Sequence, residues 1–203
     1  MPRASFLAHL GMFTVPRFLD AYACGDIRRE MRQCARDPAR ILDGESKFVV
    51  DPEKRKTEIA LVSPQTRAQI TSRLMAAVPA IEKHFSVPLV GCEPPSFLIY
   101  ETGFYYGRHV DANHNPQAPA SFRDRRVSIS IFLNGEGEES EPDTYSGGSL
   151  AFSGIRREDE HGRHSGVALT GEEGLLIGFD SDWPHEVQPV RRGTRYSIVT
   201  WFF

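Results

Sequence analysis

Residues 91–203 contain a succession of short segments with strand character, and this half of the chain constrains the fold most strongly. Between residues 127 and 133, aliphatic side chains alternate with serine and phenylalanine, which is the period of two of a β-strand. Further segments bounded by glycine, proline or aspartate are 97–100, 105–111, 147–152, 167–170, 174–179, 186–189 and 196–203. Many short strands at close intervals predict a sandwich or a barrel.

The first 90 residues have a helical pattern instead. Residues 19–34 carry apolar side chains at near-helical spacing. Ser63 followed by Pro64 is typical of a helix start. An apolar stripe follows over residues 70–85, and Pro79 within it predicts a kink or a break into two helices. Short strands are expected at 48–50 and 59–62.

Helices followed by strands predict an α+β fold. The length of 203 residues fits one domain, residues 1–203. Within it we expect residues 1–90 to be mostly helical support and residues 91–203 to form a jelly-roll or sandwich core. The oligomeric state cannot be predicted from the sequence.

Composition argues against several classes of partner. The net charge is −3, which gives no basic footprint for nucleic acid. The sequence contains no run of 18 or more apolar residues, so no membrane span is predicted. The N-terminus resembles a signal peptide only faintly, because charged and proline residues interrupt its apolar stretch. Three cysteines without a C-x-x-C motif predict reduced thiols and a cytoplasmic protein: Cys24, Cys34 and Cys92.

His109, Asp111 and His185 are the residues that point most directly to chemistry. On a strand, residues two apart face the same side, so His109 and Asp111 can reach one metal ion. With His185, 74 residues after Asp111, they make a ligand set that holds Fe(II) and leaves open coordination positions. Arg195, ten residues later, is suited to bind the far carboxylate of a 2-oxo acid through two hydrogen bonds.

Several motifs in register resemble the prolyl 4-hydroxylase branch of the Fe(II)/2-oxoglutarate-dependent oxygenases. The similarity covers about residues 97–203 and is carried by four motifs: Tyr100-x-x-Gly103-x-x-Tyr106-x-x-His109-x-Asp111, Gly147-Gly148-x-Leu150-x-Phe152, His185-Glu186-Val187-Gln188-Pro189-Val190 and Gly193-x-Arg195-Tyr196-Ser197-Ile198-x-x-Trp201. The resemblance implies a double-stranded β-helix (jelly roll) with N-terminal supporting helices. It also implies Fe(II), 2-oxoglutarate and O2 as cofactors, and hydroxylation of a C–H bond with decarboxylation of 2-oxoglutarate to succinate and CO2.

The same resemblance implies roles for particular residues. His109, Asp111 and His185 would be the metal ligands, and Arg195 would bind the distal carboxylate of 2-oxoglutarate. Ser197 shares the strand face of Arg195 and is a candidate second donor. It would compensate for Phe132, which stands where hypoxia-sensing members of the family carry a tyrosine.

Aromatic and basic residues are candidates for the pocket wall. Tyr100 would reach the cosubstrate or a metal-bound water. Tyr106 and Trp201 are expected to line the substrate pocket, although both also fit as core aromatics. Arg126 is expected near the pocket mouth, or simply flanks a strand.

Other polar residues have a plainer interpretation. His114 lies in a turn-rich segment and is expected on a solvent-exposed loop. His161 and His164 lack cysteine or histidine partners at zinc spacing and are expected on the surface. The acidic segment 135–144 is expected to be a solvated hairpin loop, with a mobile lid as the alternative.

The substrate is left open by these motifs, because fold and cofactor do not determine it. A prolyl residue in a peptide or protein is one hypothesis, and a free amino acid or small metabolite is the other. Specificity is expected to reside in residues 113–123, 136–146 and 51–56. From another class, a non-catalytic metal-binding or ligand-binding jelly roll remains an alternative, but such a module has no need for Arg195.

Overall fold

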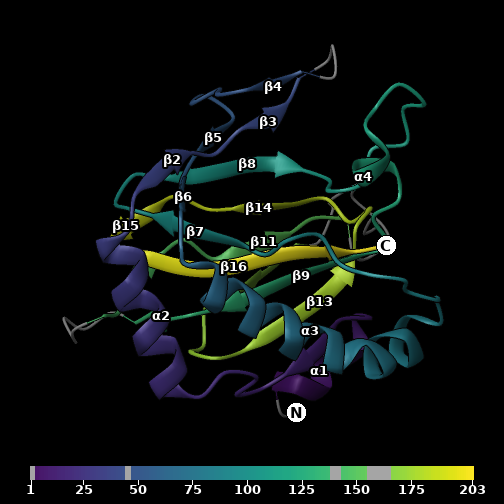
Figure 1. Cartoon of the computed structure of the whole chain (residues 1–203), viewed down its shortest axis with the longest axis horizontal. Coiled ribbons are helices and arrows are strands. Elements are labelled where there is room, and N and C mark those ends of the chain that lie inside the picture. Colours follow the sequence, from purple (N-terminus) through teal and green to yellow (C-terminus); the bar gives the residue numbers. More distant parts are fainter. Residues whose placement is uncertain (1–2, 44–46, 138–142, 155–165) are drawn as a thin grey trace, which may run out of the picture.

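The computed structural model describes residues 3–43, 47–137, 143–154 and 166–203 of the chain (Figure 1). Within them, seven strands form the larger sheet, in the order β1 (Phe13–Val15), β13 (Leu176–Asp180), β9 (Val127–Phe132), β16 (Arg195–Phe202), β7 (Ser96–Tyr100), β6 (Glu58–Ala60) and β2 (Arg36–Pro38). Five strands form the smaller sheet, in the order β12 (Val167–Leu169), β11 (Leu150–Phe152), β14 (His185–Val187), β8 (Tyr105–His109) and β5 (Arg55–Lys56).

Both sheets are antiparallel, and the chain is therefore a mixed helix-and-sheet fold. Two short antiparallel strand pairs complete the described strands: β3 (Ile41–Leu42) with β4 (Phe48–Val49), and β10 (Ser146–Gly147) with β15 (Val190–Arg192). The helices are α1 (Arg3–His9), α2 (Ala21–Gln33), α3 (Pro64–Phe85) and α4 (Ala120–Arg123). In Figure 1, α1, α2 and α3 lie along the sheet that contains β16, β9 and β13, whereas the β3–β4 pair projects from the opposite side.

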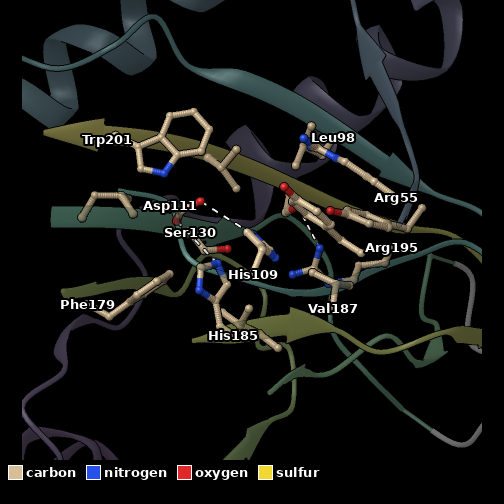
Figure 2. A pocket seen from close by; sticks show the side chains of 16 residues that line it. Arg55, Leu98, His109, Asp111, Ser130, Phe179, His185, Val187, Arg195 and Trp201 are labelled. Atoms are coloured by element: carbon tan, nitrogen blue, oxygen red, sulfur yellow. Dashed lines mark hydrogen bonds and ion pairs between the residues drawn. The ribbon is translucent and has the colours of Figure 1, made fainter. Parts of the chain in front are cut away.

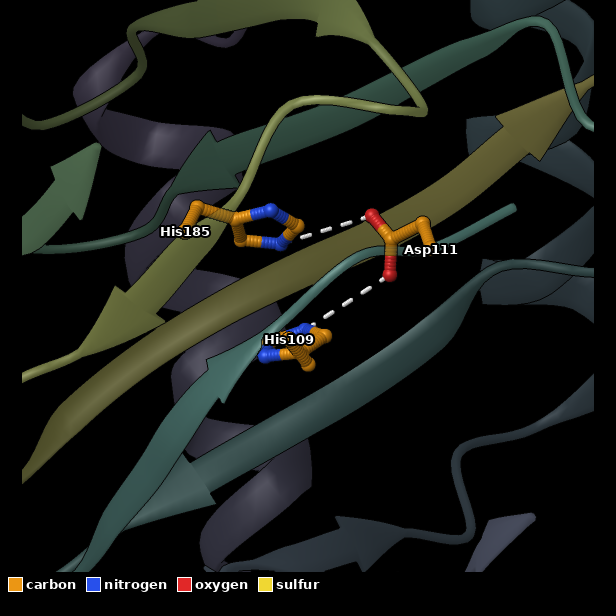
Figure 3. Close-up of side chains that lie close together, drawn as sticks. All are labelled: His109, Asp111 and His185. Atoms are coloured by element: carbon orange, nitrogen blue, oxygen red, sulfur yellow. Dashed lines mark ion pairs between the residues drawn. The ribbon is translucent and has the colours of Figure 1, made fainter. Parts of the chain in front are cut away.

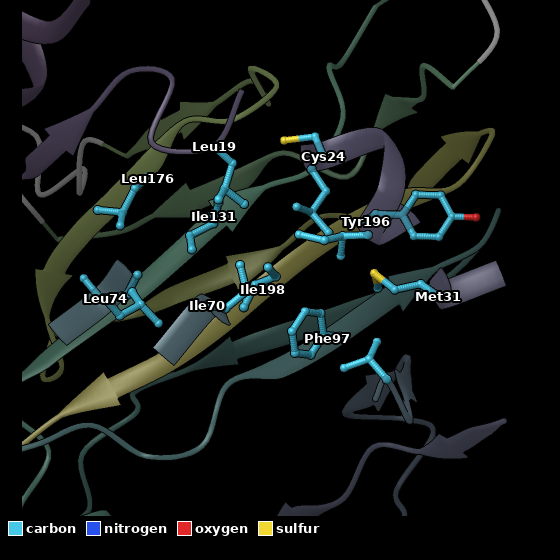
Figure 4. Packing of buried hydrophobic residues seen from close by; sticks show 14 of the residues in the cluster. Leu19, Cys24, Met31, Ile70, Leu74, Phe97, Ile131, Leu176, Tyr196 and Ile198 are labelled. Atoms are coloured by element: carbon cyan, nitrogen blue, oxygen red, sulfur yellow. The ribbon is translucent and has the colours of Figure 1, made fainter. Parts of the chain in front are cut away.

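One hydrophobic cluster joins the helices to the larger sheet (Figure 4). Cys24 and Met31 of α2 and Ile70 and Leu74 of α3 are buried in it. They pack with inward-facing residues of the sheet, among them Phe97, Ile131, Tyr196 and Ile198. Burying such apolar surface is the main favourable term in folding, so the helices act as a support that fixes the sheet.

A second cluster lies between the two sheets. Leu98, Tyr100 and Phe132 come from the larger sheet, and Phe152 and Val187 come from the smaller one. Because neighbouring residues of a strand face opposite sides, each central strand of the larger sheet contributes to both clusters. The face of the larger sheet that is turned toward the smaller sheet also carries polar side chains, among them Ser128 and Arg195.

The helices in the first 90 residues confirm much of the sequence pattern. Ser63 caps α3, since its hydroxyl accepts a hydrogen bond of 3.3 Å from the backbone N–H of Thr66, and Pro64 occupies the first turn. However, α3 runs continuously through Pro79 and is not split into two helices. The strands expected at 48–50 and 59–62 are confirmed as β4 and β6. The structure adds β1, β2, β3 and β5 to this half, and β1, β2 and β5 lie at sheet edges, where backbone pairing needs no hydrophobic alternation.

Two features of the sequence fall partly or wholly outside the described residues. His161 and His164 lie in the segment 155–165, and the acidic segment 135–144 includes residues 138–142. Among the helices that are described, none combines the length and apolar character that a membrane crossing demands.

Replacing Pro79 by alanine should stabilise the protein. Proline in a helix interior lacks the N–H that bonds to the preceding turn and costs up to about 3 kcal/mol relative to alanine. Pro79 is exposed within α3, so little packing is lost with its ring. We expect a higher melting temperature and a larger free energy of unfolding in denaturant titration. A lower melting temperature for Pro79→Ala, with Ala80→Ser as the neighbouring control, would contradict this interpretation of α3.

Candidate functional site

The structure brings His109, Asp111 and His185 together on the smaller sheet (Figure 3). His109 ends β8, Asp111 follows two residues later, and His185 begins β14, where it is the direct cross-strand partner of His109. The Nε2 atom of His109 lies 3.6 Å from Oδ1 of Asp111, and the Nε2 atom of His185 lies 3.4 Å from Oδ2. One ligand atom from each residue lies within 4.8 Å of the others, a spacing that can hold a metal ion.

Hydrogen bonds to backbone carbonyls fix the tautomer of both histidines. The Nδ1 atom of His109 lies 2.8 Å from the carbonyl oxygen of Gly107, and that of His185 lies 2.8 Å from the carbonyl oxygen of Trp183. A carbonyl oxygen can only accept, so each Nδ1 carries the proton and donates it. Both Nε2 atoms are then left with a free lone pair that faces Asp111, as metal ligation requires.

The ionisation of these groups also suits a metal ion. Burial, together with repulsion from His185, lowers the pKa of His109 to about 3, so its imidazole is neutral at physiological pH. Burial by itself would raise the pKa of Asp111. The two histidines and hydrogen bonds from Trp201 and Ser128 instead hold it below its ordinary value. The site therefore offers the neutral imidazole of His109 beside the Asp111 carboxylate.

A second layer of polar groups orients Asp111 from the larger sheet. Ser128 donates a 2.7 Å hydrogen bond to Oδ2 of Asp111, and its own oxygen lies 3.0 Å from the hydroxyl of Ser181. The side chain of Trp201 also bonds to the Asp111 carboxylate. Ser128 and Trp201 are direct partners in the pairing of β9 with β16, so the register of the larger sheet places both donors together.

Arg125 contacts both the backbone of Asp111 and the ring of Trp201. This buried guanidinium forms two hydrogen bonds with Glu93, of 2.6 and 2.9 Å, and donates a third, of 3.0 Å, to the backbone carbonyl of Asp111. It also lies 3.7 Å from the ring centre of Trp201 and 3.9 Å from that of Phe122. A planar, fully paired guanidinium in this place restricts both the Asp111 backbone and the Trp201 ring.

Arg195 is the buried cation expected for a dicarboxylate ligand. It is 1% exposed, and its Nη1 atom donates a 2.9 Å hydrogen bond to Ser197, two residues along the same face of β16. Its guanidinium lies 5.1 Å from the ring centre of Tyr100 and 5.2 Å from that of Phe132. Its Nε atom has no hydrogen-bond partner, and no carboxylate of the described residues pairs with it.

One cavity joins Arg195 to the three candidate ligands (Figure 2). Its wall includes Tyr100, Ser197 and Trp201, as well as Tyr106, which stacks on the imidazole of His109 with ring centres 3.5 Å apart. Burial raises the pKa of Tyr106 to about 12, so its hydroxyl stays protonated. These aromatic residues thus lie on the pocket wall rather than in a closed core.

A pair of glycines lies beside Arg195, and one of them leaves room for its side chain. Gly147 and Gly148 both have positive φ angles, +70° and +68°, which favour glycine. A Cβ atom on Gly148 would lie 2.9 Å from Val190 Cγ2 and 3.2 Å from Arg195 Cδ. The backbone turn therefore requires both glycines, and the space that the Arg195 side chain occupies requires Gly148.

Arg126, expected near the pocket mouth, and His114, expected on an exposed loop, both lie away from the cavity. Arg126 is exposed and is not part of the cavity wall. His114 is also exposed, and its Nε2 atom lies 2.7 Å from Asp182 rather than near the candidate ligands.

Sequence reasoning missed four residues of the site: Glu93, Arg125, Ser128 and Ser181. Arg55 lies within residues 51–56, which were expected to contribute to specificity, but it was not singled out. Ser128 had a usable signal, because the alternation of β9 places it on the same face as Ser130, which lines the cavity.

Removing the Ser128 hydroxyl should weaken metal binding. Loss of a hydrogen bond to a ligand typically costs about 10- to 100-fold in metal affinity or activity. For Ser128→Ala we expect roughly tenfold weaker Fe(II) binding in an anaerobic titration, with little change in melting temperature. Ser72→Ala, on the exposed face of α3, is the matched control. Equal Fe(II) affinities in both variants would show that Ser128 does not orient the carboxylate.

Adding a methyl group at Gly148 should displace Arg195. Since the new Cβ would meet the Arg195 stem and require a strained φ, Gly148→Ala should raise the 2-oxoglutarate concentration needed for half-saturation by about tenfold or more. The effect should exceed that of Gly103→Ala, where φ is also positive but no atom lies within 4 Å of the added Cβ. Similar 2-oxoglutarate affinities for the two variants would mean that the contact is relieved without moving Arg195.

Comparisons with known proteins place this site in a family. The model of the 2OG-Fe(II) oxygenase superfamily matches residues 95–203. A PKHD-type hydroxylase of Klebsiella pneumoniae (strain 342) is 29% identical over 195 residues, which cover 94% of this chain and 77% of that protein. A PKHD-type hydroxylase of Beijerinckia indica is 36% identical over 109 residues, 53% of this chain. This second match spans 42% of the relative, less than half its length.

The fold has a counterpart among solved structures. The crystal structure of a Pseudomonas putida prolyl-4-hydroxylase superposes with a TM-score of 0.69 and 24% identity, over 98% of this chain and 95% of that one. The family model covers the strands that carry the candidate ligands and Arg195, which is more than half of the chain. The chain belongs to the 2OG-Fe(II) oxygenase superfamily.

Proposed function

We propose that His109, Asp111 and His185 hold Fe(II) and that Arg195, with Ser197, binds the distal carboxylate of 2-oxoglutarate. The observation that carries this assignment is the arrangement of both groups in one cavity. Three ligand atoms on one side of a metal leave coordination positions for a keto acid and O2. We also propose that the two sheets form a double-stranded β-helix within a single domain, residues 1–203.

The charge of Arg195 supports the assignment of the cosubstrate. A buried, unpaired guanidinium is costly in a protein interior, and the described residues supply Arg195 with a hydroxyl but no carboxylate. An anionic ligand would remove this cost. Where hypoxia-sensing relatives have a tyrosine, the ring of Phe132 faces the guanidinium, and Ser197 provides the neighbouring hydroxyl instead.

The reaction that we propose is hydroxylation of an aliphatic C–H bond. Bound Fe(II), with O2 and 2-oxoglutarate, supplies the oxidising chemistry, while 2-oxoglutarate is converted to succinate and CO2. Ser128 and Trp201 bond to the Asp111 carboxylate, and Arg125 bonds to the backbone carbonyl of Asp111, so that the residue keeps one orientation. Tyr106 covers one face of His109 and keeps water from that side of the ligand.

The substrate that we favour is a prolyl residue in a peptide or protein. This is supported by the similarity to PKHD-type hydroxylases and by the fold of the Pseudomonas putida prolyl-4-hydroxylase. A free amino acid or small metabolite is the second candidate. A specific observation supports it: the guanidinium of Arg55, which has no acidic partner among the described residues, lines the cavity, and every free amino acid carries a carboxylate.

The assignment can be tested by anaerobic absorption spectroscopy. Adding Fe(II) and then 2-oxoglutarate to the apo protein should produce a weak visible charge-transfer band that needs both components. Asp111→Ala and His185→Ala should abolish the band and Fe(II)-dependent succinate formation while the protein stays folded by circular dichroism. Arg195→Gln should keep Fe(II) binding but require far more 2-oxoglutarate. Turnover retained in Asp111→Ala would refute the ligand assignment.

A further inference from the structure

Arg55 is a cation in the active-site cavity that has no acidic partner among the residues that the structure describes. It lies on β5, the edge strand of the smaller sheet, and lines the same cavity as His109 and Arg195 (Figure 2). Its Nη1 atom makes one long hydrogen bond, 3.3 Å, to the carbonyl oxygen of Arg40. Its Nε atom is buried without a hydrogen-bond partner, and no carboxylate among the described residues forms an ion pair with it.

The position of Arg55 is set by stacking on Tyr106. The two residues are cross-strand partners between β5 and β8, and the guanidinium carbon lies 4.5 Å from the centre of the Tyr106 ring. The ring in turn stacks on His109. A cation over an aromatic face is attracted to it but keeps its N–H donors free in the ring plane of the guanidinium. The Tyr106 ring therefore lies between the Arg55 guanidinium, with its N–H donors, and the candidate metal ligand His109.

The cosubstrate leaves this charge unmatched. In the arrangement proposed above, one end of 2-oxoglutarate lies at the metal and the other at Arg195. Of the described residues that line the cavity, only Asp111 is acidic, and it serves the metal. The adjoining groove has the same excess of positive charge, since its described wall includes Lys54 and Arg108 and no acidic side chain besides Asp111.

We propose that Arg55 binds a carboxylate of the substrate, close to the carbon that is hydroxylated. This inference rests on the proposed function and names the substrate class: a compound with an anionic group near the reacting C–H. The carboxylate has two possible sources, the α-carboxylate of a free amino acid or the side chain of an acidic residue in a peptide. An arginine binds either through two parallel hydrogen bonds, which an amide of the same shape cannot accept in the same way.

Matched acid and amide ligands distinguish these sources. The protein is loaded with Mn(II) and N-oxalylglycine, an unreactive 2-oxoglutarate analogue, and titrated calorimetrically. The first set is the free L-amino acids, L-proline included, each against its C-terminal amide. The second set is capped peptides with Asp-Pro against Asn-Pro and Glu-Pro against Gln-Pro. We expect one of the two acidic sets to bind about tenfold or more tightly than its amides.

Variants connect that preference to Arg55. Arg55→Gln should remove the preference for the acid over the amide, and Arg55→Lys should retain part of it. Arg29→Gln, an exposed surface change on α2, should leave it intact. A panel in which no acid binds more tightly than its amide, or in which Arg55→Gln keeps the full preference, overturns the proposal.

The cosubstrate provides the remaining control. The absorption band of Fe(II) with 2-oxoglutarate should form in Arg55→Gln at the same 2-oxoglutarate concentration as in the unmodified protein. A large increase in that concentration would mean that Arg55 serves the cosubstrate and would overturn the substrate assignment. No band in the unmodified protein would overturn the proposed function itself, and the substrate assignment with it.

Discussion

The pairing of β14 with β8 is the constraint on which the site depends. It sets His185 directly across from His109, and the chain then turns so that Asp111 faces both. Neither strand could hold this geometry alone, because β14 has three residues and β8 has five. Their register is kept by β11 on one side and by burial of Val187 and Phe152 against the larger sheet.

The two faces of the larger sheet serve different purposes: one packs on the helices and the other carries residues of the site. The outer face of β9 and β16 packs on α2 and α3 through residues such as Ile131 and Ile198. The inner face carries Ser128, Arg195 and Trp201 toward the smaller sheet. Helix packing therefore stabilises the platform on which the polar groups are aligned. Rigid strands position a site more accurately than loops do.

The alternation of side chains along a strand predicted which residues of the site share a face. It put His109 with Asp111 on one side, and the structure shows Arg195, Ser197, Val199 and Trp201 together on the cavity wall. It failed where geometry comes from distant segments. Arg55 enters the cavity from a two-residue edge strand whose sequence has no β-pattern, and Arg125 meets Glu93 across 32 residues. Arg126 faces solvent although the neighbouring Arg125 is buried. This difference depends on where α4 ends and β9 begins.

The sequence by itself determined the kinds of groups in the site and their local spacing, because a period of two fixes which neighbours on a strand share a face. It also determined the helix start at Ser63, since a capping side chain acts within one turn. Only the tertiary structure decided that both histidines present Nε2, that Ser128 and Trp201 hold Asp111, and that Arg55 stands unpaired in the cavity. These contacts join residues far apart in the chain, and no local pattern encodes the packing that brings them together.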